Sequence, residues 1–175
     1  MADRTSRRSV MRGALGLTAA ALTPGALWAT VKAGAPSGLT SAQTEFADQL
    51  CDAVIPATDT PGARAVGVTD FVGLALSHGL AGGSPTSLDR VKAALGTGDF
   101  AAALTRLDKA AFANEIPEAK DWKAIKQAIL MGYYTSETGA SKELRYELVP
   151  GRFDSDIPWH KGDRAWSSNW GGNSF

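Results

Sequence analysis

The sequence is poor in the residues that build most metal and disulfide sites. It contains one cysteine and two histidines among 175 residues. A single cysteine cannot form a disulfide within the chain. Neither His78 nor His160 has a second His or Cys at the spacing of a zinc site. We therefore expect no metal site and no internal disulfide.

Motifs of the common catalytic and cofactor sites are missing as well. Gly96-x-Gly98 has no third glycine and no preceding strand, so it does not read as a phosphate-binding loop. Cys51-Asp52 has no partner that would identify a nucleophile triad. We expect no catalytic or cofactor-binding residue on this chain, and infer that it does not perform chemistry alone.

Long hydrophobic runs are also absent after residue 35, where no segment is apolar enough to cross a bilayer. Near the N-terminus, Arg7 and Arg8 precede the uncharged stretch 13–22, which would rise only about 15 Å as a helix. This pattern predicts a twin-arginine (Tat) signal peptide over residues 1–35. The alternative is a basic N-terminal arm before a surface helix. Three cleavage points fit the small-residue rule: after Ala29, Ala33 or Ala35.

Charge argues against a nucleic-acid partner. Without residues 1–35 the chain would keep 13 basic and 17 acidic residues, a formal charge of −4. Proteins that bind nucleic acid need clustered basic residues to neutralise phosphates. We therefore expect no nucleic-acid partner.

Apolar residues at helical spacing predict an all-α domain over residues 36–150, a small bundle of four or five helices. Thr40 and Gln43 form the pattern of a capping box at the start of the first helix. The expected helices are 41–55, 71–78, 87–95, 100–111 and 121–131.

Cys51 lies among apolar residues at helical spacing, which favours a place in the core. An odd cysteine in an exported protein also allows an intersubunit disulfide, and the sequence leaves this alternative open.

From Gly132 the helical periodicity ends. Residues 133–139 read as turns, and 144–148 alternate as a short strand would. The final segment, 151–175, is an extended stretch holding three of the five tryptophans in its last 17 residues. Large rings left in water are unfavourable, so they either fold back or bury against another chain. Aromatic residues dominate interface energetics, so we favour a partner-binding tail.

Two parts of the sequence resemble the gluconate 2-dehydrogenase subunit 3 family. One is the segment 50–63, LCDAVIPATDTPGA, followed by residues 68–72. The other runs from LMGYYTSETG at 130–139 to the proline at residue 158. The resemblance covers roughly residues 40–170, and it is most specific at these two ends.

The resemblance implies a noncatalytic small subunit that binds, stabilises and co-exports a large FAD-dependent sugar or polyol dehydrogenase of the gluconate or glycoside type. The resemblance implies that FAD is bound by that partner and that a cytochrome c accepts the electrons. It also implies that the Tat translocase binds this chain, and that the complex lies in the periplasm, associated with the inner membrane. It does not fix the substrate. Arg7 and Arg8 are the export residues. The residues expected to bind the partner are Tyr133, Tyr134, Phe153, Trp159, Trp166 and Trp170. The alternative function is a free periplasmic carbohydrate-binding module that uses the tail tryptophans.

Overall fold

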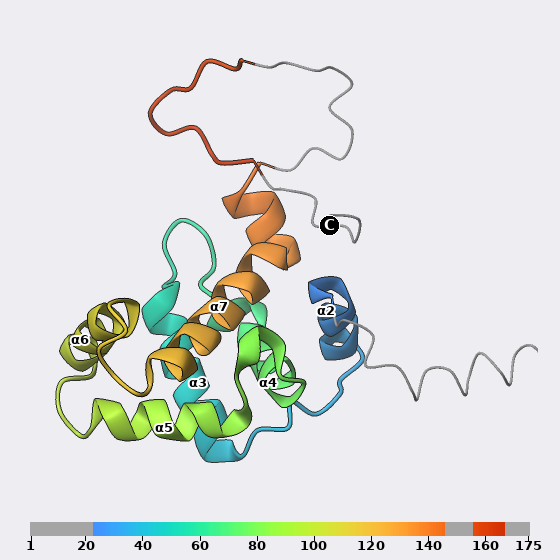
Figure 1. Cartoon of the computed structure of the whole chain (residues 1–175). Coiled ribbons are helices and arrows are strands. Elements are labelled where there is room, and N and C mark those ends of the chain that lie inside the picture. Colours follow the sequence, from blue (N-terminus) through green and yellow to red (C-terminus); the bar gives the residue numbers. More distant parts are fainter. Residues whose placement is uncertain (1–22, 146–155, 167–175) are drawn as a thin grey trace, which may run out of the picture.

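The computed structural model describes residues 23–145 and 156–166, and within these ranges the protein is a helical bundle (Figure 1). The predicted all-α fold class is confirmed. Arg7, Arg8, Phe153 and Trp170 lie outside the described residues. No helix in the described part has the length and apolarity needed to cross a membrane.

Six α-helices and three short helical turns make up the described fold. The helices are α2 (Pro24–Lys32), α3 (Ser41–Val54), α4 (Val68–Ser77), α5 (Pro85–Leu95), α6 (Phe100–Phe112) and α7 (Ala119–Thr135). The short turns are η1 (Arg64–Val66), η2 (Leu80–Gly82) and η3 (Gly139–Glu143).

Helix α7 is the centre of the bundle, and every other α-helix packs against it. Figure 1 shows α7 in orange running through the middle, with α2 and α6 on opposite sides. Its buried face carries Trp122, Ile125 and Ile129. Helix α4 lies very close to α7 at Gly132. A Cβ added there would lie 2.7 Å from a ring carbon of Phe71, which is too short a contact. A larger residue than glycine at position 132 would push these two helices apart.

The start of α3 follows the sequence prediction. Thr40 Oγ1 accepts from the Gln43 backbone N–H at 3.3 Å, and Gln43 Oε1 accepts from the Thr40 N–H at 3.0 Å. This reciprocal capping box satisfies two backbone donors that a helix start leaves without intrahelical partners.

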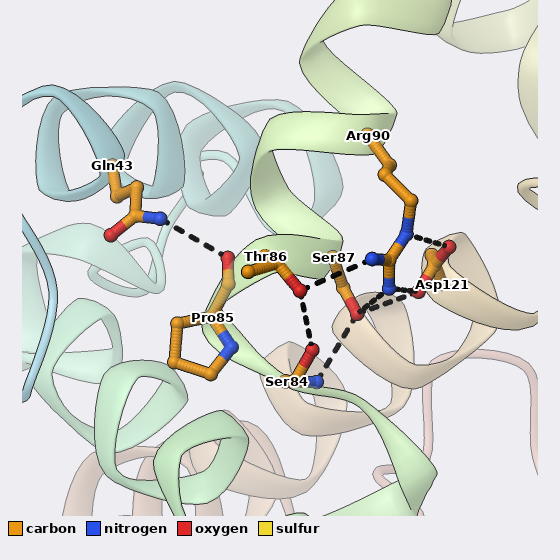
Figure 2. Close-up of polar contacts among 7 residues, drawn as sticks. All are labelled: Gln43, Ser84, Pro85, Thr86, Ser87, Arg90 and Asp121. Atoms are coloured by element: carbon orange, nitrogen blue, oxygen red, sulfur yellow. Dashed lines mark hydrogen bonds and ion pairs between the residues drawn. The ribbon is translucent and has the colours of Figure 1, made fainter.

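A cluster of polar side chains ties the start of α5 to α7 (Figure 2). Arg90 donates from Nε to one Asp121 carboxylate oxygen at 2.7 Å and from Nη2 to the other at 2.5 Å. Ser87 Oγ also donates to Asp121, at 2.6 Å. The hydrogen bond from Arg90, together with that from Ser87, lowers the pKa of Asp121 against the opposing effect of burial. Figure 2 also shows Gln43 of α3 reaching the Pro85 carbonyl, which extends the cluster to a third helix.

We predict that Asp121→Asn lowers the free energy of unfolding by about 1–3 kcal/mol at neutral pH, because hydrogen bonds to a charged group are lost. Since folding lowers this pKa, its contribution is present above the ordinary carboxyl value of 3.8 and disappears as pH falls below it. Denaturant titrations should therefore show the two proteins converging in acid. Glu115→Gln, at an exposed carboxylate, is the control, and an equal loss there would refute a specific role for the cluster.

The end of α7 differs from the sequence prediction. The helix continues to Thr135 instead of ending at Met131, so residues 133–135 are helical where turns were expected, and the helical turn 139–143 follows. The physical reason is packing: Tyr133 lies four positions after Ile129 and extends the buried face of the helix by one turn. Of the expected strand 144–148, Leu144 follows η3 directly, Arg145 forms an isolated bridge with Trp166, and 146–148 lie outside the described residues.

Helix α2 lies within the stretch that the sequence assigned to the export signal. The structure places it against α4 and α7, with Leu27 buried. The bundle therefore includes residues N-terminal to the expected domain start at residue 36.

Candidate partner interface

Four large exposed apolar side chains lie in the last turn of α7 or C-terminal to it. Trp159 is 74% exposed, and Trp166, Tyr134 and Ile157 are also large exposed residues. Figure 1 shows residues 156–166, in red, extending away from the bundle past α7. Large apolar side chains left in water favour burial against another surface. This group, Tyr134, Ile157, Trp159 and Trp166, is called the aromatic end below.

The aromatic end is attached to the bundle through Arg145. Its backbone N–H donates to the Ala165 carbonyl at 2.8 Å, and its guanidinium lies 4.1 Å from the centre of the Trp166 ring. A cation over an indole face adds attraction to the backbone contact. An open hollow of about 970 Å³ lies between this attachment and Trp159. The side chains therefore frame a concave surface, not a flat one.

Tyr133, expected to bind the partner, is not on the surface. Its side chain is 1% exposed, and its hydroxyl donates to the Pro61 carbonyl at 2.9 Å. Its ring faces the core because residue 133 falls on the buried side of α7. Within the described structure Tyr133 positions the loop after α3 and does not offer its own ring to a partner.

A second contact holds that loop at the same place. Thr60 Oγ1 donates to a Glu143 carboxylate oxygen at 2.6 Å. The two sequence segments that carry the family resemblance, 50–63 and 130–139, thus meet beside the aromatic end.

Tyr134 is the exposed neighbour of that anchor. Its ring packs edge-on against Tyr133 with centroids 5.3 Å apart. Partial burial raises the pKa of Tyr134, and the charge of Glu143 acts in the same direction. The hydroxyl is therefore neutral at physiological pH and presents a donor as well as an apolar ring.

A second exposed patch was missed from the sequence. Phe112, at the end of α6, is 57% exposed, and Leu130 of α7 is partly exposed beside it. Lys123 and Lys126 place their ammonium groups 5.4 and 4.9 Å from the Phe112 ring centre. The sequence did contain a sign of this exposure. Phe112 lies one position after Ala111, the last residue of the buried apolar stripe of α6, and therefore points away from that stripe.

Within residues 23–145 and 156–166, no group of three or more His, Cys, Asp or Glu side chains is arranged so that it could hold a metal ion. His78 and His160 are both exposed, and His160 accompanies Asp163 of the same loop, with 3.5 Å between Nδ1 and a carboxylate oxygen.

Cys51 lies in the core, as its apolar neighbours favoured. It is fully buried, and Thr69 Oγ1 donates to its sulfur at 3.9 Å. Burial raises the pKa of the thiol to about 12, and the nearby charges of Asp48 and Asp52 add to the effect. Because the thiolate is the reactive form, Cys51 in this conformation is not poised for an intersubunit disulfide.

We predict that Cys51 makes the folded state progressively less stable at alkaline pH. The unfolded thiol ionises near 9 and the folded thiol near 12, so stability should fall by about 1.4 kcal/mol per pH unit in this window. Cys51→Ala removes this dependence. Unfolding free energies measured from pH 8 to about 11 should therefore converge for the two proteins, and parallel curves would show that the thiol is not buried.

The fold and its surface together define a small helical domain with a well-packed core and exposed aromatic rings. Sequence comparison gives the family: the chain belongs to the gluconate 2-dehydrogenase subunit 3 family, which matches residues 41–111 and 88–151. The resemblance seen in the sequence is thereby confirmed. Membership makes this protein a small subunit of a dehydrogenase complex, with a larger dehydrogenase subunit as its partner. Comparison with curated proteins and with solved structures gave no significant match.

Proposed function

We propose that this chain is a noncatalytic subunit that binds and stabilises a large FAD-dependent sugar or polyol dehydrogenase and carries it to the periplasm by the Tat route. The observation that supports this most is the aromatic end, where Trp159 is 74% exposed. Tryptophan is enriched among the residues that dominate binding energy at protein interfaces.

The framework beneath the aromatic end suits a docking role. Tyr133, Thr60 and Glu143 fix the exit of the chain from α7 before any partner binds. A surface ordered in advance loses less conformational entropy on association than a disordered one. The bundle therefore serves as the rigid base, and the aromatic end as the contact.

Export of a folded complex explains why a noncatalytic subunit would accompany the enzyme. The Tat route carries folded proteins, and a flavoprotein that acquires FAD in the cytoplasm needs such a route. In this proposal FAD sits on the large subunit, Arg7 and Arg8 on this chain address the translocase, and electrons pass to a cytochrome c. The sugar substrate is set by the large subunit.

The test is affinity purification of the tagged full chain from the periplasm, with mass spectrometry and an absorbance spectrum of the eluate. We expect a larger protein carrying the flavin spectrum to elute with it. A chain recovered alone as a monomer, without flavin, would contradict the proposal. If that monomer bound saccharide in a tryptophan-fluorescence titration, the carbohydrate-binding alternative would replace it.

A further inference from the structure

Helix α2 is built into the hydrophobic core, although it lies inside the stretch that the sequence assigns to the export signal. Leu27 is 1% exposed. The Trp28 indole N–H donates to the Gly132 carbonyl and to Thr135 Oγ1, both at 3.2 Å. These partners lie more than a hundred residues further along the chain. The helix thus joins the N-terminal segment to the C-terminal end of α7.

Contacts with α4 complete this docking. The rings of Trp28 and Phe71 lie 5.3 Å apart at an interplanar angle of 34°. Val31, one turn further along α2, is partly buried against the same core. Leu27, Trp28 and Val31 therefore form an apolar face that packs against α4 and α7.

The helix also has its own start signal. Thr23 Oγ1 accepts from the Ala26 backbone N–H at 3.3 Å, and Pro24 occupies the first helical position, where its missing N–H costs nothing. A segment that begins with an N-cap and buries one face has the features of a domain helix. Signal cleavage, in contrast, needs an accessible and unstructured chain.

The chain after α2 remains in contact with α4. Ser77 Oγ donates to the Ser37 carbonyl at 3.2 Å. A Cβ at Gly73 would lie 2.6 Å from the Ser37 Cβ, so the two backbones approach too closely for any other residue. The segment from Thr23 to Ser37 is therefore held by hydrogen bonds at its start and at its end.

Each candidate cleavage point carries backbone hydrogen bonds. The Ala33 N–H donates to the Ala29 carbonyl at 3.0 Å, and the Ala35 N–H donates to the Thr30 carbonyl at 3.2 Å. The Gly34 N–H donates to the Val31 carbonyl at 2.9 Å. Proteases cut where backbone is exposed and free of such bonds. The bond after Ala29 lies within α2, and those after Ala33 and Ala35 lie in the turn that follows it. A cut at any of the three would remove a helix that is docked in the core.

We propose that the exported chain keeps α2, and that a signal peptidase, where it acts, cuts before Thr23 and not after Ala29, Ala33 or Ala35. This inference rests on the proposed export. The retained helix then clamps α4 to the end of α7, from which the aromatic end projects.

The first test is the N-terminus of the full chain recovered from the periplasm, determined by intact mass and N-terminal sequencing. We expect residues 24–32 to be present. An N-terminus at Thr30, Gly34 or Pro36 would overturn the inference while leaving the proposed export intact. A chain that never reaches the periplasm would instead contradict the export proposal, and the second test then decides on α2.

The second test measures thermal unfolding of the full chain, purified from whichever compartment holds it. Trp28→Phe removes both indole hydrogen bonds and keeps a ring in the groove, so we expect the midpoint to fall by about 3–8 °C. Leu27→Ala opens a cavity and should lower it by about 10 °C. Trp159→Phe, at an exposed ring, is the matched control and should leave the midpoint unchanged. Equal midpoints for all three variants would show that α2 is not part of the core.

Discussion

Replacing both Trp159 and Trp166 with alanine should lower the amount of large subunit that co-purifies with this chain by at least about tenfold. Interface tryptophans commonly contribute 2 kcal/mol or more each, and every 1.4 kcal/mol changes an affinity tenfold. Both rings are exposed in the described structure, so the substitutions remove no core packing. The measurement is quantitative recovery of the flavoprotein on the tagged variant compared with the natural chain.

Phe112→Ala is the matched control for this experiment. Phe112 is also a large exposed ring, but it belongs to the patch with Lys123 and Lys126 and not to the aromatic end. We expect it to leave recovery within about twofold. If Phe112→Ala abolished recovery of the flavoprotein and the two tryptophan substitutions did not reduce it, the interface would lie at the patch of Phe112, Lys123 and Lys126 instead. Circular dichroism of each variant should show unchanged helix content, which separates lost binding from lost folding.

The second large effect concerns export. Changing Arg7 and Arg8 together to lysine should retain nearly all dehydrogenase activity in the cytoplasm, because the twin arginines are what the Tat route reads. The charge of the segment is kept, so a loss would reflect recognition of arginine and not electrostatics. Activity is measured with a dye acceptor in separated periplasmic and cytoplasmic fractions, with the natural chain as reference.

Arg4→Lys is the control for that substitution, since it also exchanges one arginine near the N-terminus but lies outside the pair. It should leave the distribution of activity as it is. If the flavoprotein still reached the periplasm with both Arg7 and Arg8 changed, this chain would not be its carrier, and its role would be reduced to binding and stabilisation.

Local signals explain how much of the fold could be predicted. Thr40 and Gln43 cap α3 as their spacing required, and Asp99 caps α6 by accepting from two backbone N–H groups. Helix α5 begins at Pro85, two residues before the predicted Ser87, because proline suits the first helical position. These features depend on residues within one helical turn, so the sequence alone reveals them.

The differences arise where distant parts of the chain meet. Trp28 packs against residues more than a hundred positions away, which is why α2 was read only as part of a signal. The hydrogen bond from Tyr133 to the Pro61 carbonyl spans 72 positions, so the local pattern could not reveal it. Of the predicted partner-binding residues that are described, the structure leaves Tyr134, Trp159 and Trp166 exposed and buries Tyr133.

Hydrogen exchange of the assembled complex against the free chain tests the central claim most directly, because it reports which backbone segments become covered. We expect assembly to slow exchange at residues 156–166 and around Tyr134, while α5 and the Phe112 patch exchange as before. Unchanged exchange at residues 156–166 in a complex that still carries the flavoprotein would contradict it.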